Sequence, residues 1–151
     1  MFRILVIILL VFLDLVSKSW IYNYIQYNTF IEIAPFFDIA HIHNFGISFG
    51  FFSELQKPWL FIFISIIITI ILVVFYNQSK NYIEKIGFVI IISGAISNII
   101  DRINNGFVID FLYFHYKDFY WPAFNFADIY ITVGVFLIIS QMIKDFKNRA
   151  K

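Results

Sequence analysis

The sequence predicts an all-α membrane protein with four transmembrane helices and a small extracytoplasmic loop region that contains β-strands. Of its 151 residues, 61% are hydrophobic and only 14% are charged, whereas a soluble domain is nearer half apolar and a quarter charged. The mean hydropathy is +0.82. Apolar stretches recur four times, and the segment after the first is rich in β-branched and aromatic residues. We therefore expect residues 1–151 to form a single integral membrane domain.

The first predicted span covers residues 4–24 and is interrupted by Asp14 and Lys18. Because Arg3 precedes an apolar run, the stretch could be mistaken for a signal peptide. The apolar run continues past Lys18 to Ile21, however, and no small-residue cleavage site follows it. We therefore interpret it as a retained transmembrane helix.

The other three spans are predicted at about residues 59–76, 84–101 and 126–143. A bilayer core of roughly 30 Å requires about 20 helical residues. The second span contains no charged residue, which makes it the clearest of the three. The third and fourth reach the required length once their flanking polar residues are counted.

Basic residues indicate the direction of the spans. They gather at the N-terminus, in the loop between the second and third spans, and at the C-terminus: Arg3, Lys80, Lys85, Lys144, Lys147, Arg149 and Lys151. The positive-inside rule therefore predicts that both termini are cytoplasmic and that loops 25–57 and 102–125 lie outside. The net charge of +1 and the scattered basic residues give no indication of a nucleic-acid surface.

Loop 25–57 contains TFIEIAPFFDIAHIHNFGISFGFF, in which Pro35 and Gly46 stand between runs of β-branched and aromatic residues. This pattern predicts short strands that turn near Asn44–Gly46. Its phenylalanines suit a platform at the lipid headgroups. They are Phe36, Phe37, Phe45, Phe49, Phe51 and Phe52.

Two groups of polar residues lie within the predicted spans. Asp14 and Lys18 are four residues apart, so they share a helical face and can pair. Such a pair in a span faces the bundle interior and either fixes packing or supports an active site. The stretch SGAISNIIDR, at 93–102, combines small residues suited to close helix packing with a polar end. There we expect Asp101 to pair with Arg102, or Arg102 to hold carbonyl oxygens of a substrate.

His41 and His43 alternate in a predicted strand with Asp38 nearby, so a metal site is conceivable. No HExxH or CxxC pattern accompanies them, which favours surface or interfacial histidines. The chain has no cysteine, which removes disulfides, thiolate metal sites and a cysteine nucleophile. We expect neither a metal nor a cofactor.

Asp110 and Asp128 follow short apolar phrases at the outer ends of the third and fourth spans. Taken alone, they are either solvated interfacial carboxylates, or acids that favour a helix N-terminus, or a reactive pair. A proton- or ion-coupled transporter would instead use Asp14, Lys18, Asp101 and Asp128 as a relay, and a structural assembly subunit is a third possibility. The second span offers only Ser65 and Thr69 for a relay, which favours a peptidase.

Five phrases, in this order, resemble those of the lipoprotein signal peptidases (signal peptidase II), which are four-span aspartic proteases of bacterial membranes. They are Asp14 with Lys18, NFGISFG at 44–50, SNIIDR at 97–102, VIDF at 108–111 and FNFAD at 124–128. Each phrase alone is weak evidence for the resemblance, but five phrases in the same order, on a matching topology of four spans, are strong evidence. Ser97 stands where the family usually has glycine, and Ile47 and Ser48 replace small residues.

The resemblance implies cleavage of prolipoproteins just before a diacylglyceryl-modified cysteine, at the outer face of the bacterial cytoplasmic membrane. It implies catalytic Asp110 and Asp128, one ionised and one protonated. The implied substrate-binding residues are Asn44, Asn98, Arg102 and Asn125, and the supporting residues are Asp14, Lys18, Asp101 and Gly46. The expected partners are the prolipoprotein substrate and membrane lipid, and we expect a monomer.

Overall fold

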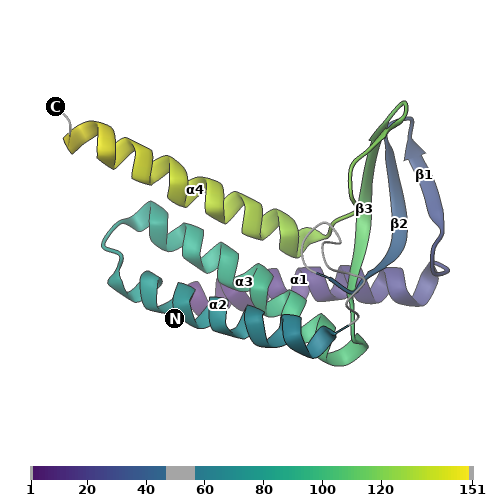
Figure 1. The fold of residues 1–151 in the computed structure, drawn as a ribbon, viewed down its shortest axis with the longest axis horizontal. Coiled ribbons are helices and arrows are strands. Elements are labelled where there is room, and N and C mark those ends of the chain that lie inside the picture. Colours follow the sequence, from purple (N-terminus) through teal and green to yellow (C-terminus); the bar gives the residue numbers. More distant parts are fainter. Residues whose placement is uncertain (1, 47–56, 150–151) are drawn as a thin grey trace.

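A computed structural model describes residues 2–46 and 57–149. In these residues four helices are long and apolar enough to cross a membrane, and a small antiparallel sheet accompanies them (Figure 1). The helices are α1 (Phe2–Tyr24), α2 (Pro58–Gln78), α3 (Tyr82–Asn105) and α4 (Phe126–Arg149). The predicted fold class is confirmed, and each helix extends a few residues beyond its predicted span.

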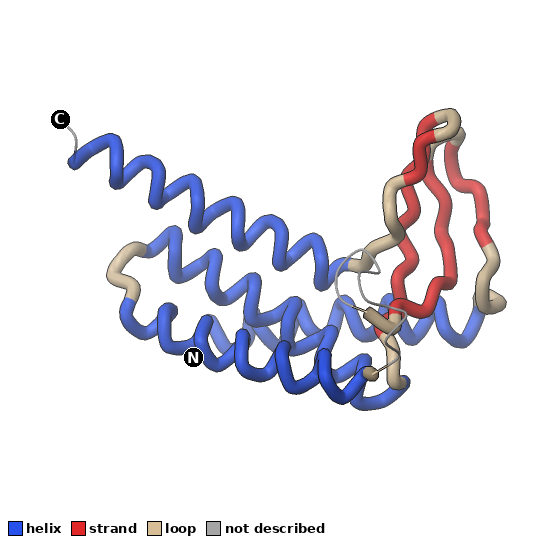
Figure 2. Tube along the Cα trace, viewed as in Figure 1, coloured by secondary structure: helices blue, strands red, loops and turns tan. Residues whose placement is uncertain are grey.

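The sheet lies at one end of the helical bundle, which we call the site end (Figure 2). Its strands are β1 (Phe30–Ala34), β2 (Phe37–Asn44), β3 (Val108–Tyr116) and β4 (Phe119–Tyr120). The spatial order is β1-β2-β3-β4, and all neighbours are antiparallel. The other end, which we call the far end, carries the chain termini and the α2–α3 turn (Figure 1).

β2 ends at Asn44 and the chain bends at Gly46, near the expected turn, while residues 47–56 lie outside the described residues. The turn of the β1–β2 hairpin occurs earlier, at Pro35 and Phe36, where Ala34 pairs directly with Phe37. Proline has its φ preset for the first central position of a turn and has no N–H to donate to a sheet, so it ends β1. β2 consequently continues as far as Asn44.

Helix α3 is central and packs against α1, α2 and α4. Two glycines let α3 and α4 approach closely. A Cβ on Gly134 would lie 2.5 Å from Ile91 Cγ1 and 2.6 Å from the backbone oxygen of Gly87. Close approach through small residues is a common basis of helix association in membranes, where burial from water supplies little driving force.

The ends of α3 are well defined. Asn81 caps its N-terminus by accepting hydrogen bonds from the N–H groups of Ile83 and Glu84. Gly106 ends it in the left-handed conformation, with φ of 80°, which glycine adopts without a steric penalty. The chain then enters β3 at Val108, so the last turn of α3 lies beside the start of that strand.

A cluster of buried apolar residues joins the sheet to the bundle. Ile21 of α1 and Ile25, which directly follows that helix, pack with Ile109 and Phe111 of β3. Phe126, at the start of α4, meets the Phe111 ring edge to face, with centroids 5.2 Å apart. This cluster holds β3 and the first turn of α4 together, and both catalytic candidates lie on these two elements.

Candidate active site

Asp110 lies on β3 with only 2% of its surface exposed. Its two carboxylate oxygens accept hydrogen bonds from two side-chain amides, Asn44 Nδ2 at 2.9 Å and Asn125 Nδ2 at 2.6 Å. In the β2–β3 register Asn44 faces Val108, two residues before Asp110. Residues two apart in a strand share a face, so the pairing of β2 with β3 brings Asn44 to Asp110.

Asp128 lies in the first turn of α4, where it forms a capping box with Asn125. The Asn125 Oδ1 accepts a 3.0 Å hydrogen bond from the Asp128 N–H, and Asp128 Oδ2 accepts a 3.3 Å bond from the Asn125 N–H. Reciprocal bonds of this kind satisfy backbone donors that a helix N-terminus otherwise leaves unpaired. Asn98 Nδ2 of α3 donates to the other Asp128 oxygen at 3.2 Å.

The two aspartates differ in their surroundings. Burial and the negative charge of Asp128 raise the pKa of Asp110 to about 8, although its two amide donors favour the ionised form. The raised pKa favours the protonated form of Asp110. Asp128 is only half-buried and borders a cavity. A merely solvated interfacial carboxylate does not describe Asp110.

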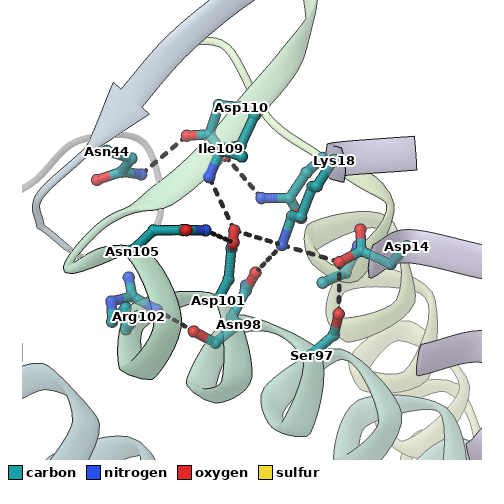
Figure 3. A network of polar contacts seen from close by, with 12 residues as sticks. Asp14, Lys18, Asn44, Ser97, Asn98, Asp101, Arg102, Asn105, Ile109 and Asp110 are labelled. Atoms are coloured by element: carbon teal, nitrogen blue, oxygen red, sulfur yellow. Dashed lines mark hydrogen bonds and ion pairs between the residues drawn. The ribbon is translucent and has the colours of Figure 1, made fainter. Parts of the chain in front are cut away.

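Lys18 is the centre of a buried polar network that links α1 to α3 (Figure 3). Its Nζ lies 2.8 Å from Asp14 Oδ2 and 3.3 Å from Asp101 Oδ2, and it donates to Asn98 Oδ1 at 2.7 Å. The predicted pairing of Asp14 with Lys18 is confirmed. Because Asn98 also contacts Asp128, the network reaches the candidate catalytic pair through the Asn98 side chain.

Asp14 has two further partners that the sequence did not reveal. Ser97 Oγ donates to its Oδ2 at 2.5 Å, and the N–H of Ala127 donates to its Oδ1 at 2.8 Å. Ser97 is completely buried, so this serine serves as a hydrogen-bond donor to a buried carboxylate. A small polar residue within an apolar span is the only sequence signal for such a contact.

The expected ion pair between Asp101 and Arg102 is wrong. Asp101 contacts Lys18 and accepts hydrogen bonds from the N–H of Ile109 and from Asn105 Nδ2, at 2.9 Å and 2.7 Å. Neighbouring residues on a helix point about 100° apart, which separates the two side chains. Asp101 therefore anchors the start of β3, while Arg102 faces the cavity.

Arg102 donates to two backbone oxygens, Asn98 O at 3.3 Å and Gly46 O at 2.5 Å. The Gly46 N–H in turn donates to Asn44 Oδ1 at 2.9 Å. Within the part of the chain that the structure describes, Arg102 Nε is a buried donor without a partner. Native proteins seldom leave such a donor unsatisfied, so it is available to an oxygen of a bound molecule.

A cavity of about 310 Å³ lies beside these side chains, between α2 on one side and α3 and α4 on the other. Asn44, Asn98, Arg102 and Asp128 line one part of it. Aliphatic residues form the other part: Ile64, Ile68, Leu72, Ile91 and Ile131. The cavity can therefore hold a molecule that is polar at one end and apolar at the other.

The two histidines of β2 differ in exposure. His41 is buried, not at the surface as expected, and its Nδ1 donates to the Ile25 oxygen at 2.7 Å, whereas His43 is half-buried. His43 Nε2 lies 3.0 Å from His41 Nε2, and its ring stacks on Phe107 at 3.6 Å. Burial and His41 lower the pKa of His43 to about 4, so it is neutral at pH 7. Asp38 contacts His115 instead, at 3.2 Å.

All ten site residues predicted from the sequence lie in the described part of the chain, at the site end of the bundle, and hydrogen bonds or ion pairs connect them. Other residues named in the sequence analysis, namely Ile47, Ser48, Phe49, Phe51 and Phe52, lie outside the described residues. Phe36, Phe37 and Phe45 are described, and the Phe37 ring packs on Phe114 at 4.7 Å.

The fold and this site define a multi-pass membrane protein with a buried carboxylate site at one end of its helices. The sequence matches the family model described as Signal peptidase (SPase) II over residues 6–144. It is 38% identical to the lipoprotein signal peptidase of Clostridium tetani over 148 residues, which cover 95% of this chain and 93% of that protein. It is 40% identical to that of Bartonella henselae over 143 residues, covering 93% and 87%.

The structure is also similar to that of a bacterial membrane enzyme determined by the in meso method, with a TM-score of 0.88 and 34% identity. The match covers 97% of this chain and 90% of that one. The chain therefore belongs to the signal peptidase II family. Membership makes it a peptidase that removes signal peptides from prolipoproteins.

Proposed function

We propose that the protein cleaves prolipoproteins immediately before a diacylglyceryl-modified cysteine, using Asp110 and Asp128 to activate a water molecule. The observation that carries this proposal is the shared contact of both aspartates with Asn125, beside a cavity that is polar at one end and apolar at the other. A lipid-modified peptide is likewise polar in one part and apolar in another. Its scissile amide is polar, and its acyl chains require apolar walls.

The surroundings of the two aspartates suggest their roles. Asp110, whose pKa is raised to about 8, enters the reaction as the acid. The half-buried Asp128 is the base, because two neighbouring carboxylates share one proton more favourably than both ionise. Asp128 takes a proton from water, and the water oxygen bonds to the carbonyl carbon while Asp110 donates its proton to the carbonyl oxygen. A protonated carboxyl can still accept the bonds from Asn44 and Asn125.

The intermediate then collapses to products. The C–N bond breaks, the proton held by Asp128 passes to the leaving amine of the modified cysteine, and Asp110 recovers its proton from the former carbonyl oxygen. The products are a carboxyl group on the signal peptide and a free amine on the lipoprotein. No covalent enzyme intermediate is required.

We assign substrate binding to Asn44, Asn98, Arg102 and Asn125. The first three line the cavity, and Asn125 contacts Asp110. Arg102 has a buried Nε donor to offer a substrate carbonyl, and bonds from a charged donor are the stronger kind. Amides and guanidinium groups donate hydrogen bonds but do not exchange protons near neutral pH. Asp14, Lys18, Asp101 and Gly46 hold these side chains in place.

We further propose that the chain is a single integral domain of the bacterial cytoplasmic membrane and acts as a monomer. Both termini are cytoplasmic in this arrangement, and the site faces outward. The support is the position of the basic residues. Arg3, Lys85 and Lys144 belong to the far end of the bundle, opposite the sheet (Figure 1).

The decisive experiment uses Asp110→Asn, Asp128→Asn and the double variant, assayed on a lipid-modified prolipoprotein in detergent. Each single change should abolish cleavage, because asparagine is similar in size but cannot act as an acid or a base. The double variant should lose no more than either single variant, since the pair works as a unit. Asp118→Asn, in the exposed β3–β4 turn, is the matched control and should retain activity. Substantial turnover by either single variant would exclude the two-aspartate mechanism.

A further inference from the structure

A second and larger cavity, of about 880 Å³, lies at the far end of the bundle between α1, α2 and α3. Its walls are aliphatic and include Val6, Leu10, Ile86 and Ile90. Arg3, Tyr76 and Tyr82 stand at its end, close to the N-terminus and the α2–α3 turn (Figure 1). Arg3 and Leu10 are seven residues apart on a helix, so this apolar wall extends about 10 Å along the helix axis.

Two cationic side chains converge on one ring at the end of this cavity. Arg3 Nη1 donates to the Tyr76 hydroxyl at 2.6 Å, and its guanidinium carbon lies 5.5 Å from the ring centroid. Lys85 Nζ also lies 5.5 Å from that centroid. Ring contacts of this kind attract each cation weakly, but the two positive charges repel each other. An anion placed beside both would remove that repulsion.

The protein supplies no such anion among its described residues. No carboxylate there forms an ion pair with Arg3 or Lys85. The neighbouring acid, Glu84, accepts a 2.7 Å hydrogen bond from Ser79 Oγ at the start of α3. The guanidinium group of Arg3 has five N–H donors, of which Tyr76 occupies one.

We propose that this cavity, which we call the far-end groove, binds an anionic phospholipid. Its phosphate contacts Arg3 and Lys85, and one acyl chain lies along the groove wall formed by Val6 and Leu10. Basic pockets between transmembrane helices bind anionic headgroups in this way. Two other molecules that could occupy the far-end groove fit it less well. A signal peptide begins with a positively charged region that these cations would repel, and a second copy of the chain would present the same two cations.

Native mass spectrometry of the full-length protein in a nonionic detergent tests the proposal, with phosphatidylglycerol and phosphatidylcholine as probes. Phosphatidylglycerol should bind more tightly. Arg3→Gln and Lys85→Gln should each weaken its binding about fivefold, because one basic residue near an anionic headgroup contributes roughly that much. The matched control is Lys144→Gln with Lys147→Gln, which removes two charges from the exposed end of α4 and should leave binding unchanged.

A second variant separates lipid binding from binding of an anion alone. Val6→Trp fills the groove but keeps both cations, and it should also weaken phosphatidylglycerol binding. Inorganic phosphate should not compete. Thermal unfolding in detergent should show that each variant is folded, and peptidase activity should persist because the groove is remote from Asp110. Equal binding of the two lipids, equal losses in the test and control variants, or displacement by phosphate would each overturn the proposal.

Discussion

The side-chain amide of Asn125 donates a 2.6 Å hydrogen bond to Asp110, while the oxygen of the same amide accepts a 3.0 Å bond from the backbone N–H of Asp128. One completely buried residue thus caps α4 and contacts the carboxyl group on β3. The relative position of the two aspartates consequently depends on Asn125. Its two hydrogen bonds can be removed separately, which makes the dependence testable.

Asn125→Ser should keep most of the stability of the protein and lose most of its activity. Serine caps helices about as well as asparagine, but it lacks the amide that reaches Asp110. Asn125→Ala should lose activity as well, and it should also lower the free energy of unfolding by about 0.5–2 kcal/mol through the missing cap. Cleavage assays and detergent unfolding curves measure the two effects. Full activity of Asn125→Ser would show that the contact with Asp110 is dispensable.

Cleavage should decline as the pH rises through about 8. The raised pKa of Asp110 means that the protonated acid predominates below this value and disappears above it. Since the proposed mechanism requires the protonated form, kcat/KM should fall tenfold for each further pH unit. Rates measured between pH 6 and 9.5 on a lipid-modified substrate provide the check. A rate that stays constant up to pH 9.5 would contradict the role of Asp110 as the acid.

Lys18→Met should lower the free energy of unfolding by about 3–5 kcal/mol, since removing one partner leaves buried charges uncompensated. Asp14 and Asp101 would both lose their cation, and all three side chains are buried. Lys57→Met is the control, because Lys57 is exposed just before α2, and it should be nearly neutral. Unfolding by dodecyl sulfate, followed by circular dichroism, compares the variants. Similar curves for both would show that the network contributes little to stability.

Gly134→Ala should destabilise the packing of α3 against α4. The added methyl group would lie 2.6 Å from the Gly87 oxygen, which is too close for a carbon atom. Inserting a methyl group into a well-packed contact typically costs about 1–3 kcal/mol. The adjacent change Val135→Ala alters an exposed side chain and serves as the control. If the two variants unfold alike, the helices can separate slightly at little cost.

The features that could be predicted from the sequence are those set by neighbouring residues. Hydropathy over about 20 residues reveals a membrane helix, and a spacing of four reveals the Asp14–Lys18 pair, which lies at 2.8 Å. The ordered phrases also indicate the family and the candidate site residues. Each span, pair and phrase lies within a short segment, and the order of the phrases is itself a property of the sequence, so none of these signals depends on the folded chain.

The contacts that assemble the site join residues far apart in the chain. Asn44 meets Asp110 across 66 positions because β2 pairs with β3, and Ser97 meets Asp14 across 83 positions because α3 packs on α1. Likewise, Asp101 pairs with Lys18 rather than with its neighbour Arg102. Strand register and helix rotation select these partners, since both depend on how whole surfaces fit together. Spacing within one segment carries no information about that fit.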